Sequence, residues 1–187
     1  MEKPPKTPRP RKGPIHPPRP DDSLHPEIGL LLERTIGRFV ISWARLESTL
    51  THFIWFCFDL DISRGRIITT NLGATRLIKM LRDIGQIELG EIHKFNLSII
   101  LDKVDILKDD RNLIVHGNWA RNNRGRTAII SMRVKSEDPK YVVGEVFTRQ
   151  KMQALVQTCD TLRLGLHRLH KECAALRNKP EEQHPEG

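Results

Sequence analysis

The distribution of proline limits where this 187-residue chain can form long helices. Eight of the twelve prolines lie within residues 1–20, and Pro139 is the only proline between Glu27 and Asn178. Because proline breaks the interior of a helix, this distribution favours a helical body that follows a proline-rich arm. The sequence therefore predicts a disordered basic arm over residues 1–26, one folded domain over 27–178 and a flexible tail over 179–187.

The net charge of +8 is concentrated in the arm. Residues 1–20 carry six basic side chains and one acidic one, so the rest of the chain has a net charge of only +3. A positive surplus favours an anionic partner such as nucleic acid. The arm itself is open to two interpretations: it attracts phosphates, or it is a solubilising tail or a ligand for a proline-binding module.

Hydrophobic residues recur with a helical period in four segments. These are Glu27–Phe58, Gly73–Leu89, Glu91–His116 and about Thr148–Arg177. Two segments of alternating residues, Thr127–Val134 and Tyr141–Thr148, predict a β-hairpin over about 127–148. The predicted fold class is all-α, a helical bundle with one inserted β-hairpin.

The apolar side chains of each helix predict which of its faces is buried. In the first two helices they are Phe39, Trp43, Leu46, Leu50, Phe53 and Ile54, and then Leu77, Ile78, Leu81 and Ile84. In the third they are Ile92, Phe95, Ile99, Ile106, Leu107, Leu113 and Ile114. In the last they are Met152, Leu155, Cys159, Leu162, Leu166, Leu169, Cys173 and Leu176. This last row fits a contact inside the bundle, and a zipper between two chains is the alternative.

The cysteines and histidines give no sign of a disulfide scaffold or a metal site. Cys57, Cys159 and Cys173 are widely spaced and form no C-x-x-C pair. His167, His170 and Cys173 rotate around a helix, which favours a solvated histidine pair beside a core cysteine over a metal centre. No signal peptide or membrane-spanning stretch is recognisable, so we expect a cytoplasmic protein with no membrane partner and no cofactor.

One segment combines residues that can act on a phosphate. Arg111 is followed by Asn112, an apolar Leu-Ile-Val run, His116 and Gly117. Six Arg and His pairs in the chain have a similar spacing, but only this one has a polar residue directly after the arginine and lies near the end of a late predicted helix. The pattern resembles the signature of the HEPN superfamily, in which an arginine precedes a histidine by a short helical interval. The order of the helices over about 27–178 is similar too.

The HEPN resemblance implies a helical bundle that forms a homodimer and cleaves RNA without a metal ion. The RNA 2′-hydroxyl would attack its neighbouring phosphate and leave a cyclic 2′,3′-phosphate. His116 would act as general acid or base, Arg111 would hold the phosphate, and Asn112 would orient either of them. Such enzymes include toxins and phage-defence effectors, which are controlled by an antitoxin or other partner protein. The alternative is a non-catalytic HEPN-like module that binds RNA or a partner protein.

The residues of this segment also have structural interpretations. Arg111 can pair with Asp110 or another neighbour while His116 caps the helix end. If the helix ends at Gly117, the negative end of its dipole favours a protonated His116, which suits an acid.

Five further residues are candidates for the same site. Glu47 lies inside the apolar arc of the first helix and needs a partner. This is either Arg111 or His116, as a supporting contact to the site, or else Arg45 or another surface base in a salt bridge. The other four follow the motif in an expected loop, where they can stack on a base and hold phosphates or belong to a plain exposed loop: Trp119, Arg121, Arg124 and Arg126.

Overall fold

The computed structural model describes residues 30–121, 129–134 and 142–178. These residues form five helices: α1 (Leu30–Cys57), α2 (Ile62–Thr69), α3 (Ala74–Glu88), α4 (Glu91–His116) and α5 (Arg149–Arg177). They also form three strands: β1 (Asn118–Arg121), β2 (Ile129–Val134) and β3 (Val142–Phe147). The described part is thus mainly helical, as predicted. The expected arm over 1–26 and tail over 179–187 lie outside the described residues.

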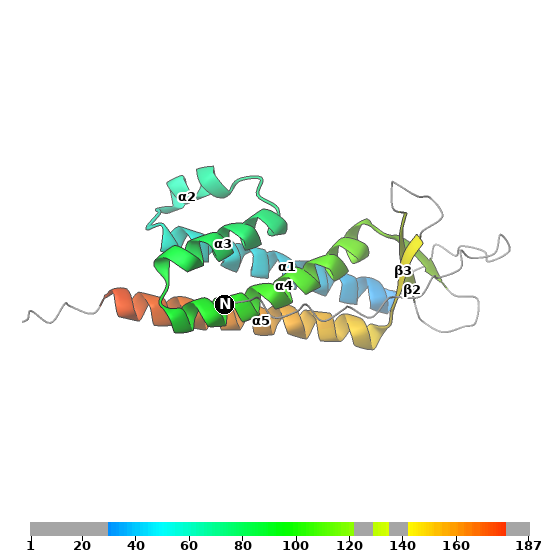
Figure 1. Ribbon diagram of the computed structural model, residues 1–187. Helices are drawn as coiled ribbons and strands as arrows, with labels where there is room; N and C mark the ends of the chain where they lie inside the picture. The colour runs from blue at the N-terminus through cyan, green and yellow to red at the C-terminus, as the bar shows by residue number, and fades with distance from the viewer. Residues whose placement is uncertain (1–29, 122–128, 135–141, 179–187) are drawn as a thin grey trace, which may run out of the picture.

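The long helices lie side by side and share one core (Figure 1). α1, α3 and α5 run in one direction, and α4 returns in the opposite one. The small sheet lies at the end of the bundle where α4 ends and α5 begins, which we call the sheet end. None of the helices in the described part is long and apolar enough to cross a membrane.

α1 and α5 form the most extensive helical contact in the fold. All six apolar residues predicted to face inward from α1 are buried, and Phe39, Leu46, Leu50 and Ile54 are completely so. The predicted row of α5 is buried from Met152 to Cys173, and only Leu176 at its end is exposed. The row therefore packs inside the chain. Each buried side chain of this size contributes roughly 1.5–3 kcal/mol.

The far ends of α1 and α5 are tied together by Arg177. Its guanidinium donates to the carbonyl oxygen of Phe56 at 2.9 Å and lies 4.5 Å from the centre of the Phe56 ring. A second nitrogen lies 3.4 Å from the carbonyl oxygen of Cys57. A cation at the last carbonyls of a helix satisfies groups that have no partner within the helix and complements its dipole.

The face that α4 buries differs from the prediction. Leu107, Leu113 and Ile114 are buried as expected, but Ile92, Phe95, Ile99 and Ile106 are between 40% and 69% exposed. The helix instead buries a neighbouring row, Leu97, Leu101 and Val104. Two apolar rows run along this helix, and its periodicity does not choose between them.

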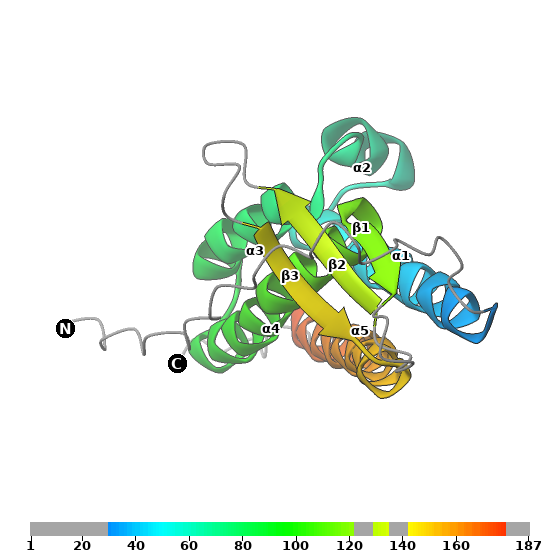
Figure 2. The same ribbon diagram turned by 90° about the vertical axis from the view of Figure 1, so that its right-hand side faces the viewer.

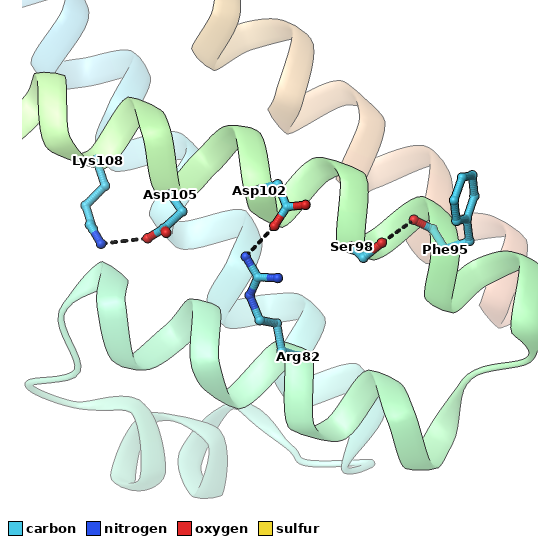
Figure 3. Close-up of polar contacts among 6 residues, drawn as sticks. All are labelled: Arg82, Phe95, Ser98, Asp102, Asp105 and Lys108. Carbon is cyan, nitrogen blue, oxygen red and sulfur yellow. Dashed lines mark hydrogen bonds and ion pairs between the residues drawn. The ribbon is translucent and has the colours of Figure 1, made fainter. Parts of the chain in front are cut away.

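The contact with α3 explains which row of α4 is buried. Leu97 packs so close to Gly85 of α3 that a Cβ at Gly85 would lie 2.8 Å from Leu97 Cδ2. Beside this contact, Arg82 of α3 reaches across to Asp102 of α4, with 2.7 Å between Nη2 and Oδ1 (Figure 3). Close apolar packing and an exposed ion pair thus orient α4, and the ion pair adds little stability because it is exposed.

The short helix α2 was not predicted. Asp61 caps its first turn, with the Arg64 amide donating to Asp61 Oδ1 at 2.9 Å. Gly65 lies against the indole of Trp55, whose Nε1 donates to Thr69 Oγ1 at 3.1 Å. The helix lacks a buried apolar row, so it depends on this cap and on the contact with Trp55.

The predicted hairpin is present as the antiparallel pair β2 and β3. The segment after α4 was expected to be a loop, and this was wrong, because Trp119 and Arg121 lie in β1. β1 pairs antiparallel with β2, Trp119 opposite Ser131, and gives the sheet the order β1-β2-β3. When the bundle is viewed from its sheet end, the sheet lies across it (Figure 2).

Two glycine substitutions test the docking of α2. In Gly65→Ala the new Cβ would lie 2.5 Å from Trp55 Cδ2, so either α2 or the indole must move. We expect a loss of about 1–3 kcal/mol in the free energy of unfolding, measured by urea denaturation.

The matched control is Gly37→Ala in α1, where a Cβ meets no atom within 4 Å. Since alanine favours a helix over glycine, this variant is expected to gain about 0.5–1 kcal/mol. Equal effects of the two substitutions would contradict the close approach of α2 to Trp55.

Candidate functional site

Arg111, Asn112 and His116 meet at the last turn of α4, at the sheet end of the bundle. Arg111 Nη1 lies 3.2 Å from Asn112 Oδ1 and 3.1 Å from His116 Nε2. Arg111 and Asn112 are half-buried and His116 is exposed. The helix ends at Gly117, whose amide donates to the Leu113 carbonyl at 3.0 Å. We call Arg111, Asn112 and His116 the trio.

The contact between Arg111 and His116 indicates which ring nitrogen is the acceptor. A guanidinium has only donors, so His116 Nε2 accepts in this hydrogen bond. The tautomer that fits this contact has its proton on Nδ1. The acid role expected from the helix dipole stays a prediction.

Lys151 is a cation near the trio that sequence reasoning missed. It comes from the first turn of α5, where its Nζ lies 4.0 Å from Asp110 Oδ1 and 4.4 Å from the centre of the Phe147 ring. Asp110 thus faces Lys151, whereas Arg111 contacts another neighbour, Asn112, as the structural interpretation also allowed. Lys151 and Arg111 are far apart in sequence, so only the fold reveals that they belong to one end of the bundle.

Trp119 connects the sheet to the trio's helix. Its indole Nε1 donates to the carbonyl oxygen of Ile114 at 3.0 Å, and its ring lies 5.8 Å from that of Phe147, which is completely buried. The half-buried indole is thus used for structural contacts, and stacking on an RNA base stays a prediction. Arg121 lies in β1, while Arg124 and Arg126 lie outside the described residues.

Glu47 lies half-buried in the middle of α1. Of its two expected contacts, neither the one with the trio nor the one with Arg45 forms among the described residues. Its side chain makes no hydrogen bond or ion pair within the described ranges, while its main-chain carbonyl accepts from Thr51 Oγ1 at 3.0 Å. A supporting role for Glu47 at the site therefore stays a prediction without a contact behind it.

The three cysteines belong to the core and not to a site. Burial raises the pKa of Cys57 to about 11 and that of Cys159 to about 12, and it raises the pKa of Cys173 as well. These thiols stay protonated at neutral pH and are poor nucleophiles. Within the described ranges, no group of three or more His, Cys, Asp and Glu residues is arranged to hold a metal ion.

Of the histidine pair expected to be solvated, His167 is exposed and His170 is half-buried. The ring centre of His170 lies 4.4 Å from that of Phe56 and 5.9 Å from that of Phe53. Burial lowers its pKa, and the neighbouring His167 and His52 lower it further. His170 therefore packs as a neutral aromatic ring against α1.

Comparison with known proteins adds no relative. No model of a known protein family matches the chain, and no curated protein or solved structure is significantly similar to it. The resemblance to the HEPN superfamily therefore rests on the motif and on the order of the helices.

The tautomer of His116 tests the geometry of the trio. With both residues in place, we expect the neutral ring to carry its proton on Nδ1, because Arg111 donates to Nε2. Arg111→Ala removes that donor, and the proton should shift towards Nε2. Two-bond correlation of ring protons with nitrogens in the NMR spectrum distinguishes the two tautomers.

The exposed His167 serves as the internal reference, and its spectrum should be the same in both proteins. A His116 ring that already carries its proton on Nε2 in the unaltered protein would contradict the hydrogen bond from Arg111.

Proposed function

We propose that this chain is a metal-independent endoribonuclease of the HEPN type that acts as a homodimer. The observation that carries the proposal is the trio: one guanidinium nitrogen lies within hydrogen-bond distance of both an amide oxygen and an imidazole nitrogen. These groups lie at an accessible helix end, where a phosphate can reach them. Arginine and histidine together can hold a phosphodiester and move protons on it.

The roles of the three side chains follow from their contacts. Arg111 binds the scissile phosphate and stabilises the charge that develops on it. When the guanidinium turns to the phosphate, it releases His116 Nε2, whose lone pair can then accept the proton of the attacking 2′-hydroxyl. Asn112 keeps hold of the guanidinium through its amide oxygen and so positions it. A histidine whose Nε2 accepts from Arg111 in this way suits the base of the reaction.

A homodimer gives the site a second set of the same groups. One trio supplies a single base and a single cation, whereas cleavage also needs an acid for the leaving oxygen. A two-fold axis that brings two α4 ends together would supply that acid from the second copy. α4 also has an exposed apolar row, Ile92, Phe95, Ile99 and Ile106, which lies on another face of the helix than the trio and offers a surface for association. The row extends over about 21 Å, given the rise of an α-helix.

The same row favours a second candidate function, a non-catalytic module that binds RNA or a partner protein. Apolar rows exposed to water usually mark contact surfaces. In that case the trio would bind a phosphate without cleaving it. A toxin or phage-defence role, with an antitoxin or similar partner that neutralises it, belongs to the first candidate and would appear as growth arrest when the chain is expressed alone.

The two candidates separate in an RNA cleavage assay in the presence of EDTA. We expect the unaltered protein to cleave RNA, because the trio supplies its charge and protons from side chains alone. His116→Ala and Arg111→Ala should each lower the rate by a factor of about 10²–10⁴, the range for the loss of general acid–base catalysis. Gel electrophoresis of labelled RNA measures the rate.

Matched controls are His167→Ala and Arg168→Ala, which remove the same side-chain types from an exposed part of α5. They should cleave at the unaltered rate, and circular dichroism should show all four variants folded. RNA that is bound but stays intact across structured and single-stranded substrates would replace the enzyme with the binding module.

A further inference from the structure

A groove of about 520 Å³ lies between the first halves of α1 and α5. Arg34 and Arg38 of α1 and Arg149 of α5 line it, together with the amides of Gln153 and Gln157. Its size falls within the range of pockets that hold small ligands. The groove lies at the sheet end, but on the side of α5 that faces α1, whereas Lys151 of the same helix faces Asp110 of α4.

In the described part of the chain, the three arginines of this groove have no anionic partner. None of them makes an ion pair or a side-chain hydrogen bond within the described residues, and none of the residues that line the groove is acidic. The next acid on that face of α5 is Asp160, about one turn beyond Gln157. Three positive charges therefore share one depression that no acidic side chain lines.

The start of α5 adds to the positive potential of the groove. Arg149 is the first residue of this helix, and its first turn holds no acidic side chain. Cations are unfavourable there, because the helix dipole places positive charge at that end. An anion in the groove would remove this repulsion and satisfy the guanidinium groups together.

We propose that the groove between α1 and α5 is a phosphate-binding site for nucleotides or for a nucleic-acid strand. Guanidinium groups bind phosphate oxygens through paired hydrogen bonds, and three of them suit a ligand with more than one negative charge. Arg34 and Arg38 are four residues apart on α1 and therefore reach into the groove from one helix face. The two glutamine amides can donate and accept, which suits the sugar and base attached to a phosphate.

This site is separate from the trio and does not require the chain to cleave RNA. Its test uses a short fluorescein-labelled 2′-O-methyl oligouridylate, which lacks the free 2′-hydroxyl and cannot be cleaved by its attack. Titration of the full chain measures strand binding by fluorescence anisotropy, and calorimetric titration with ATP measures binding of a free nucleotide. The two titrations distinguish the two sources of the phosphate.

The decisive comparison is between two triple variants with the same change in charge. Arg34→Gln, Arg38→Gln and Arg149→Gln together alter the groove, whereas Arg66→Gln, Arg76→Gln and Arg168→Gln together alter exposed arginines elsewhere. We expect the groove triple to bind roughly tenfold or more weakly and to lower the salt dependence of strand binding by about two in the slope of log K against log salt. The control triple should bind within about twofold of the unaltered protein.

If the groove triple loses oligouridylate binding and the control triple does not, the result supports a strand site. If instead the groove triple loses only ATP binding, the result supports a nucleotide site. Equal weakening by both triples would overturn the proposal, because it would assign binding to general positive charge. Absence of binding to both probes in the unaltered protein would overturn it as well.

Discussion

The contact between α1 and α5, which run in the same direction, determines where the functional groups of this protein lie. Their far ends are joined by Arg177, and their near ends enclose the arginine-lined groove. Because α5 starts at the same end as α1, α4 must return to that end before the sheet. The last turn of α4 therefore carries Arg111 and His116 to the sheet end, and the Trp119 indole attaches the sheet there. The arginines of the groove and Arg111 of the trio thus lie at the same end of the bundle, although the chain after the N-terminal arm has a small net charge.

Sequence patterns predicted those helices in which a single row of apolar residues recurs with the helical period and is also the row that the fold buries. α1, α3 and α5 each have one apolar row, and their predicted ends lie within a few residues of the observed ones. α4 has two rows, so its burial depends on the close approach of Gly85 to Leu97, which no single-helix pattern contains. α2 and β1 depend on tertiary partners: α2 needs the Trp55 indole, and the four residues of β1 need β2 as a neighbour. Short elements of this kind have too few residues for a period to be recognisable.

The candidate site was predictable where it depends on local helix geometry. The spacing of Arg111, Asn112 and His116 placed them within one helical turn and a half, and their side chains indeed meet. The contact of the imidazole with Arg111 was not predictable from the spacing alone, because it depends on the side-chain conformations of both residues. The expected contact of Glu47 with the trio joins two helices, α1 and α4, and it does not form within the described residues. The groove was not predicted either, because it is formed by two helices and Arg149 is more than a hundred residues from Arg34 in the sequence.

We propose above all that the trio directs the 2′-hydroxyl of RNA at the adjacent phosphate. The most direct measurement is the mass of the product ends after a short RNA of defined sequence is incubated with the protein in EDTA. The account predicts one fragment that ends in a cyclic 2′,3′-phosphate and one that begins with a 5′-hydroxyl. Fragments with a 5′-phosphate and a free 3′-hydroxyl would show that water, and not the RNA itself, is the nucleophile, and would contradict the role assigned to Arg111 and His116.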